Sequence, residues 1–207
     1  ILNYNSGGYL SKCLKSLCRS KLNDEIEVIV VDNKSTDQSF RQAQTVSSTN
    51  RHLSFKFKSL SSNIGFSRGN NQGVKLISPS SKLVLFLNPD TLVLPNTLQK
   101  SINFFHRHSN AAALTCRLIL ALNHRLQPEC HRGFPTPWRS LCYFSGLSKV
   151  FPKSSLFNGY FLGHLNTQKT HRIEACVGAF LMVRRLVGEN VGGWNEKYFF
   201  YGEDLDL

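Results

Sequence analysis

The chain has 207 residues and a formal net charge of +12, with 41% hydrophobic and 18% charged residues. These proportions exclude a disordered chain and indicate one globular domain that is long enough to bury a core. The longest apolar run, residues 83–87, is far too short to span a bilayer. Because the chain lacks an initiator Met and begins within an apolar run, we expect a fragment that lacks part of its first strand.

Strand-like and helix-like segments alternate along the chain. Strands are expected at residues 1–2, 26–31, 53–58 and 82–87. Apolar residues recur at helical spacing from Leu10 to Cys18, and a second helix is expected after Pro95 and Asn96. This alternation predicts an α/β fold of Rossmann-like type, with a mostly parallel sheet flanked by helices. The periodicity fades from about residue 117 to 172, and an apolar run returns at 173–183.

Polar clusters follow three of the expected strands, at residues 3–6, 32–37 and 88–91. In an open parallel sheet, ligands bind beyond the carboxyl ends of the strands. Solvated turns alone would fall at both ends of the strands, so this distribution indicates a ligand site at one edge.

Asp32 ends the second expected strand and is followed by a turn of polar residues. A carboxylate in this position can accept hydrogen bonds from a nucleotide base or from ribose hydroxyls. The alternative is a helix cap formed by Ser35 or Asp37. Both interpretations can hold, since Asp37 could cap a helix while Asp32 binds a ligand.

Residues 63–73 combine three glycines, three asparagines and Arg68 at a loop-to-helix junction. Glycines allow a phosphate to approach the backbone, and the start of a helix supplies N–H donors. The spacing matches neither the dinucleotide fingerprint nor a P-loop. A tightly packed structural turn is the alternative.

Carboxylates mark two further places in the sequence. Asp90 follows a buried strand, where it would suit Mg²⁺ or Mn²⁺, although Asn88-Pro89-Asp90 alone is an ordinary turn. Glu203 and Asp204 belong to an acidic cluster near the end of the chain, which could bind a metal, accept a proton or cap a helix. Capping is the natural interpretation of that cluster alone, but the segments around Asp32 and Asp90 favour catalysis.

The middle of the chain is strongly basic. Between Asp90 and Glu174 the only acid is Glu129, against ten Lys and Arg. Such a stretch should attract phosphate, although a solvated surface without a specific partner is the simpler interpretation. The six cysteines form no Cys-x-x-Cys pair, and the spacing of His124, Cys130 and His131 matches no zinc site. We expect reduced thiols in a cytoplasmic protein.

Six short motifs occur in the order and at the spacing of one enzyme family. They are Asn3-Tyr4-Asn5 and the segments 30–37, 63–73, 87–91, 178–185 and 192–207. Together they resemble glycosyltransferase family 2, the inverting enzymes of the GT-A fold, and within it the rhamnosyltransferase-like branch of bacterial surface polysaccharide synthesis. The resemblance implies one GT-A domain over residues 1–207, with a nucleotide-binding half at about 1–92 and an acceptor-binding half at about 93–207.

The resemblance also implies roles for particular residues. Asp204 would be the general base, with Glu203 in reserve because neighbouring carboxylates perturb each other. Asp90 stands where the family's metal-binding Asp-x-Asp motif ends and would bind Mn²⁺ or Mg²⁺, while Asn88 replaces the first acid of that motif. The nucleotide-binding residues would be Asn3, Tyr4, Asn5, Asp32, Asn33, Asn63, Gly65, Arg68, Asn71 and Asn88.

The implied reaction is a displacement at the anomeric carbon of a nucleotide sugar, with inversion. The donor would be a UDP- or dTDP-sugar, with dTDP-rhamnose among the candidates, and the acceptor a saccharide or a lipid-diphosphate-linked saccharide. No nucleic acid is expected as a partner. As a hypothesis, the basic, aromatic middle segment meets the lipid diphosphate at an anionic membrane, which would make the cytoplasmic enzyme peripheral at the inner face of the plasma membrane.

Three other functions remain open. A sugar nucleotidyltransferase would need a Gly-rich phosphate loop near its first strand, and residues 3–8 have two glycines but no Lys or Arg. A basic nucleic-acid-binding module lacks the support of any helix-turn-helix, RRM or zinc-finger pattern. A non-catalytic relic of the fold is the third alternative, because a fold does not imply a function.

Overall fold

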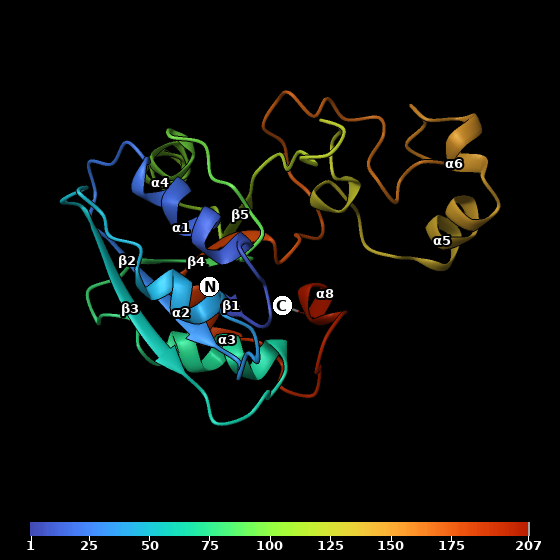
Figure 1. Cartoon of the computed structure of the whole chain (residues 1–207). Coiled ribbons are helices and arrows are strands. Elements are labelled where there is room, and N and C mark those ends of the chain that lie inside the picture. The colour runs from blue at the N-terminus through green and yellow to red at the C-terminus, as the bar shows by residue number, and fades with distance from the viewer. Residues whose placement is uncertain (207) are drawn as a thin grey trace. The chain divides into compact units, whose positions relative to one another are not determined.

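The computed structural model describes residues 1–206, which divide into two compact units (Figure 1). The first unit comprises residues 1–114 and the chain from Gly178 onward, and the second comprises Thr115–Val177. Leu207, the last residue of the expected domain, lies outside the described residues. The expected division into a nucleotide-binding and an acceptor-binding half concerns ligands and stays a prediction.

A parallel sheet forms the start of the first unit. Its strands are β1 (Leu2–Asn3), β2 (Ile26–Asp32) and β3 (Leu53–Ser59), in the order β1-β2-β3. In the register of the sheet, Asn3 pairs with Asp32 and Asp32 with Ser59, so the three strands end at the same edge. Val30 and Val31 are almost fully buried, as expected for a strand covered on both faces.

Four helices accompany this sheet and the strand that follows it. They are α1 (Tyr9–Cys18), α2 (Ser39–Gln44), α3 (Phe66–Val74) and α4 (Thr97–Arg107). The helical spacing expected from Leu10 onward is confirmed in α1, whose residues Leu10, Cys13, Leu14 and Leu17 are buried. The α3 helix packs against β1 and β2, and α1 packs against α2 (Figure 1).

A second sheet completes the first unit. It has the order β4 (Leu83–Leu87), β6 (Phe180–Arg184) and β5 (Ala113–Thr115), and β4 pairs with β6 in antiparallel register. Two short helices follow, α7 (Arg185–Asn190) and α8 (Glu203–Asp206). Trp194 is 1% exposed and packs its ring between Phe66 and Phe86, which joins α3 to β4.

The apolar run expected at residues 173–183 is only partly a strand. The β6 strand begins at Phe180, while Ala175 forms an isolated bridge with Arg132 inside the second unit. The part of the run before Gly178 therefore belongs to the second unit, and the part from Gly178 onward belongs to the first.

The second unit consists mostly of turns. Its helical elements are the 3-10 turn η1 (Pro128–Cys130) and the helices α5 (Pro137–Phe144) and α6 (Leu147–Val150). This agrees with the loss of periodicity in the sequence. Across residues 1–206, no helix is long and apolar enough to cross a membrane.

Candidate functional site

A buried amide links the ends of β1 and β2. The Asn3 side chain is fully buried, and its Nδ2 donates to Asp32 Oδ1 at 2.7 Å and to Ser39 Oγ at 2.9 Å. The Ser35 hydroxyl donates to Asp32 Oδ1 at 2.6 Å, and the Ser35 N–H donates to Oδ2 at 3.1 Å. Asp32 is 4% exposed. Its carboxylate is therefore held in one orientation by uncharged donors at the end of β2.

The loops after β1 and β2 are tied to each other. Asn5 Oδ1 accepts from the Thr36 N–H at 2.7 Å, and Asp37 Oδ2 accepts from the Gly7 N–H at 2.8 Å. Partial burial raises the pKa of Asp37, but hydrogen bonds from the Ser39 hydroxyl and from the N–H groups of Gly7 and Ser39 outweigh it and lower the pKa below its usual value. Asp37 thus lies at the start of α2 and holds the loop of Asn3-Tyr4-Asn5 in place.

Two residues of these loops have a left-handed backbone. Asn5 has a φ of 47° and Lys34 a φ of 64°. Residues other than glycine adopt such angles at a cost of about 1–3 kcal/mol, and such strain gathers at functional sites. Tyr4, beside Asn5, is 49% exposed, so its ring is open to a ligand at this edge of the sheet.

Asn33 connects the end of β2 to the glycine-rich loop. Its Nδ2 donates to Asn63 Oδ1 at 2.7 Å and to the Gly65 carbonyl at 3.2 Å, while its Oδ1 accepts from the Ile64 N–H at 2.9 Å. Asn63 Oδ1 also accepts from the Gly65 N–H at 3.0 Å. Asn33 is 3% exposed. Both ends of this amide are therefore used to shape the loop that starts α3.

Gly65 in turn contacts the C-terminal segment. Its φ is +86°, and a Cβ at this position would lie 2.7 Å from the carbonyl oxygen of Phe199. The same carbonyl accepts from the Phe66 N–H at 2.7 Å. Only glycine allows this close approach, which fixes Phe199 to the glycine-rich loop.

The α3 helix holds the same segment at a second point. Asn71 Nδ2 donates to the Trp194 carbonyl at 2.8 Å, and Asn71 Oδ1 accepts from the Trp194 N–H at 3.1 Å. Arg68 Nε lies 3.6 Å from Glu196 Oε2, with both side chains about half exposed. The Asn71 amide therefore holds the backbone of Trp194 to α3, and the Arg68 guanidinium forms an ion pair with the Glu196 carboxylate.

The acidic residues near the end of the chain lie in α8. Glu203 is 7% exposed, Asp204 is half-buried, and Asp206 is exposed and accepts from Asn195 Nδ2 at 2.8 Å. Just before α8, Tyr201 has a φ of 69° and is 77% exposed. The helix starts at Glu203, which agrees with the alternative in which these acids open a helix. A catalytic role for Glu203 and Asp204 stays a prediction.

Asn88 and Asp90 form the turn after β4. The Asn88 N–H donates to the Ala179 carbonyl at 3.1 Å, and its carbonyl accepts from the Thr91 N–H at 3.2 Å. Asp90 is exposed. Burial raises the pKa of the Cys13 thiol in α1 to about 12, and the nearby Asp90 carboxylate adds to the rise. Asp90 is therefore a solvent-accessible carboxylate beside α1.

Within residues 1–206, no group of three or more His, Cys, Asp or Glu side chains is placed to hold a metal ion. Mg²⁺ keeps several waters and is often bound by one or two carboxylates plus substrate phosphates. The exposed carboxylate of Asp90 fits such a site, in which a diphosphate would complete the coordination.

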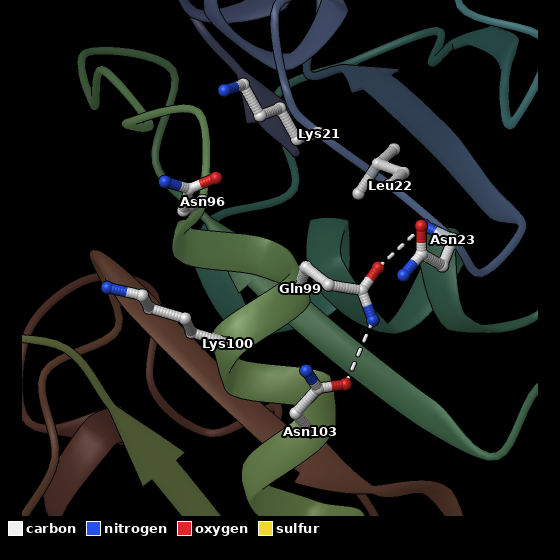
Figure 2. Close-up of a pocket in the computed structure, with 7 residues that line it drawn as sticks. All are labelled: Lys21, Leu22, Asn23, Asn96, Gln99, Lys100 and Asn103. Atoms are coloured by element: carbon white, nitrogen blue, oxygen red, sulfur yellow. Dashed lines mark hydrogen bonds between the residues drawn. The ribbon is translucent and has the colours of Figure 1, made fainter.

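A polar cavity of about 370 Å³ lies elsewhere, between the loop before β2 and the start of α4 (Figure 2). The Gln99 side chain lines the cavity. Its Oε1 accepts from the Asn23 N–H at 2.7 Å, and its Nε2 donates to Asn103 Oδ1 at 3.0 Å. The loop precedes β2, so the cavity lies at the amino end of that strand, away from Asp32. None of the predicted site residues lines it.

Two polar clusters lie in the second unit. Arg139 forms a two-pronged ion pair with Glu174, which also accepts from the Phe134 N–H at 2.8 Å. The Arg139 guanidinium and this N–H lower the pKa of Glu174 to about 2. His131 Nε2 lies 2.6 Å from His171 Nε2, and its Nδ1 lies 3.0 Å from the Phe161 carbonyl oxygen.

Sequence reasoning missed several residues of this arrangement. The sequence suggests Ser35 only as a cap and gives no role to Ser39, although Ser35 contacts the Asn3 and Asp32 side chains and Ser39 contacts Asn3. Their place just after a strand-ending acid is a signal that could have identified them. Phe199 and Glu196 had no local signal, because their partners lie more than a hundred residues earlier in the chain.

Solved structures share this fold over nearly the whole chain. TarS from S. aureus (residues 1–349), in complex with UDP, superposes with a TM-score of 0.61 at 22% identity, covering 99% of this chain and 51% of that chain. The mannosyltransferase PcManGT from Pyrobaculum calidifontis, in complex with GDP-Man and Mn²⁺, superposes with a TM-score of 0.63 at 15% identity, covering 99% and 48%. These likenesses confirm the expected α/β class and place the fold among the GT-A glycosyltransferases.

The chain belongs to glycosyl transferase family 2, whose family model matches residues 1–185. TarS of Staphylococcus aureus (strain Mu50), a poly(ribitol-phosphate) beta-N-acetylglucosaminyltransferase, is 32% identical over 112 residues, which are 54% of this chain and 19% of TarS. The rhamnosyltransferase WbbL of Escherichia coli (strain K12) is 27% identical over 150 residues, 69% of this chain and 52% of WbbL.

A third relative covers the whole chain. It is the N-acetylglucosaminyl-diphospho-decaprenol L-rhamnosyltransferase of Mycobacterium tuberculosis (strain CDC 1551), 24% identical over 215 residues, 100% of this chain and 67% of that protein. The expected resemblance to family 2 and its rhamnosyltransferases is therefore confirmed. The chain spans only about a fifth of TarS and half of WbbL.

Proposed function

We propose that this chain is a glycosyltransferase that moves a sugar from a nucleotide-sugar donor to a saccharide or lipid-linked acceptor, with inversion, in the synthesis of a cell-surface polymer. The observation that carries the proposal is the linkage of three segments at one edge of the parallel sheet. Asn3 holds Asp32, Asn33 shapes the loop at Gly65, and Gly65 contacts Phe199, close before the acids of α8.

The donor nucleotide would bind along this edge. Asp32 is pre-oriented by Asn3 and Ser35, so its carboxylate can accept a hydrogen bond from a base N–H without rearrangement. The exposed ring of Tyr4 is available to stack on the base. The donor would be a UDP- or dTDP-sugar, dTDP-rhamnose included. The UDP complex of TarS and the names of the rhamnosyltransferase relatives support this choice.

Asp204 is the candidate general base. A base must be ionised and must reach the acceptor hydroxyl, and Asp204 is half-buried while Glu203 is 7% exposed. Asp204 would remove the proton as the acceptor oxygen attacks the anomeric carbon. Glu203 is the reserve candidate for the base, because neighbouring carboxylates perturb each other's protonation.

Asp90 is the residue that would hold Mn²⁺ or Mg²⁺, together with the donor diphosphate. When bound, the metal neutralises the charge that develops on the departing diphosphate. The Mn²⁺ in the PcManGT complex supports this part of the proposal. Asn88, in place of the first acid of the Asp-x-Asp motif, would contribute an uncharged amide to the same turn.

We also propose that the reaction takes place in the cytoplasm. Cys13, Cys18, Cys130 and Cys142 are free thiols. Disulfides form and persist in oxidising compartments, so these thiols agree with a reducing one.

The test is thermal unfolding with UDP, dTDP and GDP, each with and without Mn²⁺. A ligand at about 100 times its Kd adds about 2.7 kcal/mol of stability, which is about 5–10 °C in a chain of this size. We expect a metal-dependent rise with one nucleotide that is lost in Asp90→Ala. Glu25→Ala removes an exposed carboxylate at the opposite end of β2 and is expected to keep the rise.

A transfer assay with the nucleotide sugar and a saccharide acceptor tests the base. Asp204→Asn is expected to keep the nucleotide-dependent rise in thermal stability, while transfer of the sugar to the acceptor hydroxyl, with release of the nucleotide, slows by about 10²–10⁴-fold. No rise with any nucleotide in a well-folded sample would overturn the proposal, and salt-sensitive binding of DNA or RNA in that sample would favour the nucleic-acid alternative. A rise that survives in Asp90→Ala would remove Asp90 from the metal site.

A further inference from the structure

Large apolar side chains are exposed on α5, α6 and the turn that follows them. Leu141 is 56% exposed, Phe144 83%, Val150 67% and Phe151 46%. Single exposed apolar residues are normal on a protein surface, but a contiguous group of them usually marks a binding surface. Trp138 adds an indole ring that is 45% exposed.

These side chains belong to one face. Trp138, Leu141 and Phe144 follow each other at intervals of three in α5, which makes each a surface neighbour of the next, whereas Cys142, four residues after Trp138, is fully buried. The α5 and α6 helices pack on each other. The Phe157 ring lies 6.2 Å from the Trp138 ring and 4.9 Å from the Phe151 ring, so it joins the start of α5 to the end of α6.

The charge around this face is positive. Lys149 and Lys153 are exposed and flank Val150 and Phe151 in the sequence. No Asp or Glu occurs from residue 130 to 173. Arg139, on the same helix, is already paired with Glu174, so the two lysines are the cations next to the exposed apolar residues. Lysine stems can lie along an apolar surface while their ammonium groups reach outward to phosphate.

Of the possible occupants, an anionic lipid surface matches both features. A second copy of the chain in a two-fold contact would bring together two faces that both carry Lys149 and Lys153, and the repulsion between these like charges costs free energy. A nucleic acid would use the lysines but leave Leu141, Val150 and Phe144 exposed. Short amphipathic helices with Trp, Phe and Leu on one side and lysines beside them are typical of segments that lie in the membrane interface.

We propose that Trp138, Leu141, Phe144, Val150 and Phe151, with Lys149 and Lys153, form a lipid-docking face that binds peripherally to an anionic bilayer. The apolar side chains enter the boundary between headgroups and acyl chains, and the two lysines meet lipid phosphates. This proposal does not depend on catalysis, because vesicle binding is measured without nucleotide or acceptor. Either proposal can therefore fail while the other stands.

The test is co-sedimentation of the full chain with vesicles of phosphatidylcholine alone or of phosphatidylcholine and phosphatidylglycerol in equal parts. We expect binding to the anionic vesicles that weakens as salt is added. Each lysine near such a surface contributes about fivefold, so the double variant Lys149→Gln and Lys153→Gln should bind about 25-fold more weakly. Lys169→Gln replaces an exposed lysine of the same unit outside the face. This variant is expected to bind with an affinity within about fivefold of the wild type.

The apolar part has its own variant pair. Leu141→Ser with Phe144→Ser is expected to weaken binding by more than about tenfold, because the exposed apolar area that enters the bilayer is lost. Leu122→Ser removes a leucine of the same unit that is 96% exposed and serves as the matched control, with binding unchanged. Since all three residues are exposed, the thermal transitions of these variants should match the wild type.

Trp138 supplies a second readout that sedimentation does not. Its emission should shift to shorter wavelength when the vesicles bind, and Trp138→Phe should abolish that shift, because Trp194 is already buried. Absence of binding to anionic vesicles would overturn the proposal. So would equal losses in Leu122→Ser and the double serine variant, or a dimer that dissociates when Phe144 is replaced, since that would assign the face to a second copy.

Discussion

His131 is a buried histidine whose two ring nitrogens both have partners. It is 7% exposed, with Nδ1 at 3.0 Å from the Phe161 carbonyl oxygen and Nε2 at 2.6 Å from Nε2 of His171. Because a carbonyl oxygen only accepts, the hydrogen of a neutral His131 must be on Nδ1, and its Nε2 then accepts from His171. The contact between the two rings lasts only while one of the facing nitrogens lacks a hydrogen.

Mild acid is therefore expected to destabilise the second unit. Burial lowers the pKa of His131 below 6.5, and the charges of His171 and His164 lower it further, against the hydrogen bond to Phe161. Between the lowered folded value and 6.5, the unfolded chain binds a proton that the folded chain does not, so the free energy of unfolding falls as the pH falls. The measurement is the denaturant midpoint at about pH 7.5 and about pH 5.5.

His131→Gln is expected to reduce this pH dependence, since glutamine keeps a donor and an acceptor but does not titrate. The matched control is His124→Gln, which replaces an exposed histidine of the same unit and should keep the pH dependence of the wild type. If His131→Gln and the wild type lose stability equally between the two pH values, His131 is not the group that responds.

At the scale of elements, the glycine-rich loop and the C-terminal segment behave as one piece. Gly65 has a φ of +86°, and its Cα faces the backbone of Phe199 so closely that a Cβ would lie 2.7 Å from the carbonyl oxygen. Backbone cannot give way as a flexible side chain can. A methyl group at residue 65 must therefore move either α3 or the segment that leads to α8.

Gly65→Ala is expected to lower the free energy of unfolding by about 1–3 kcal/mol, from the left-handed backbone and the contact with Phe199 together. It should also weaken the nucleotide-dependent rise in thermal stability, because the same loop is held by Asn33. Denaturant unfolding and the nucleotide titration measure the two effects.

Gly188→Ala is the matched control. Gly188 lies within α7, and the nearest atom to its added Cβ is Val183 Cγ2 at an ordinary 3.7 Å. Alanine should stabilise that helix by up to about 1 kcal/mol. Equal stabilities of Gly65→Ala and Gly188→Ala would show that the loop is not fixed to Phe199 in solution.

The elements also show how far the sequence could lead. Helical spacing located α1, and the buried apolar run located β2, because both patterns are local. The same reasoning could not find the contact of Gly65 with Phe199, which joins residues far apart in the chain and leaves no periodic trace. Asp32 was identified as a strand-ending acid, but its burial by Asn3 depends on the register of two strands. The base role of Asp204 stays a prediction, because a helix start at Glu203 agrees with capping and with catalysis.

At the scale of the whole molecule, each unit contains one of the two tryptophans. Trp194 in the first unit is 1% exposed, and Trp138 in the second is 45% exposed. The units also differ in their cores. Of the large and fully buried side chains, Phe105, Phe180 and Leu14 belong to the first unit, whereas Cys142 is the member from the second among the described residues.

The smaller core of the second unit predicts that it unfolds first. Regions with few buried apolar contacts open at a lower free energy than well-packed ones. In a denaturant titration, the emission of Trp138, obtained as the difference between the wild type and Trp138→Phe, should change at a lower denaturant concentration than the emission of Trp194. Because Trp138 is half exposed, its replacement by Phe should leave the free energy of unfolding that is measured from the Trp194 signal within about 0.5 kcal/mol of the wild type.

Iodide should quench the Trp138 signal alone in the folded protein. Coincident transitions of the two signals would instead mean that the small core of the second unit is stabilised by the first, and that the chain unfolds as one cooperative domain.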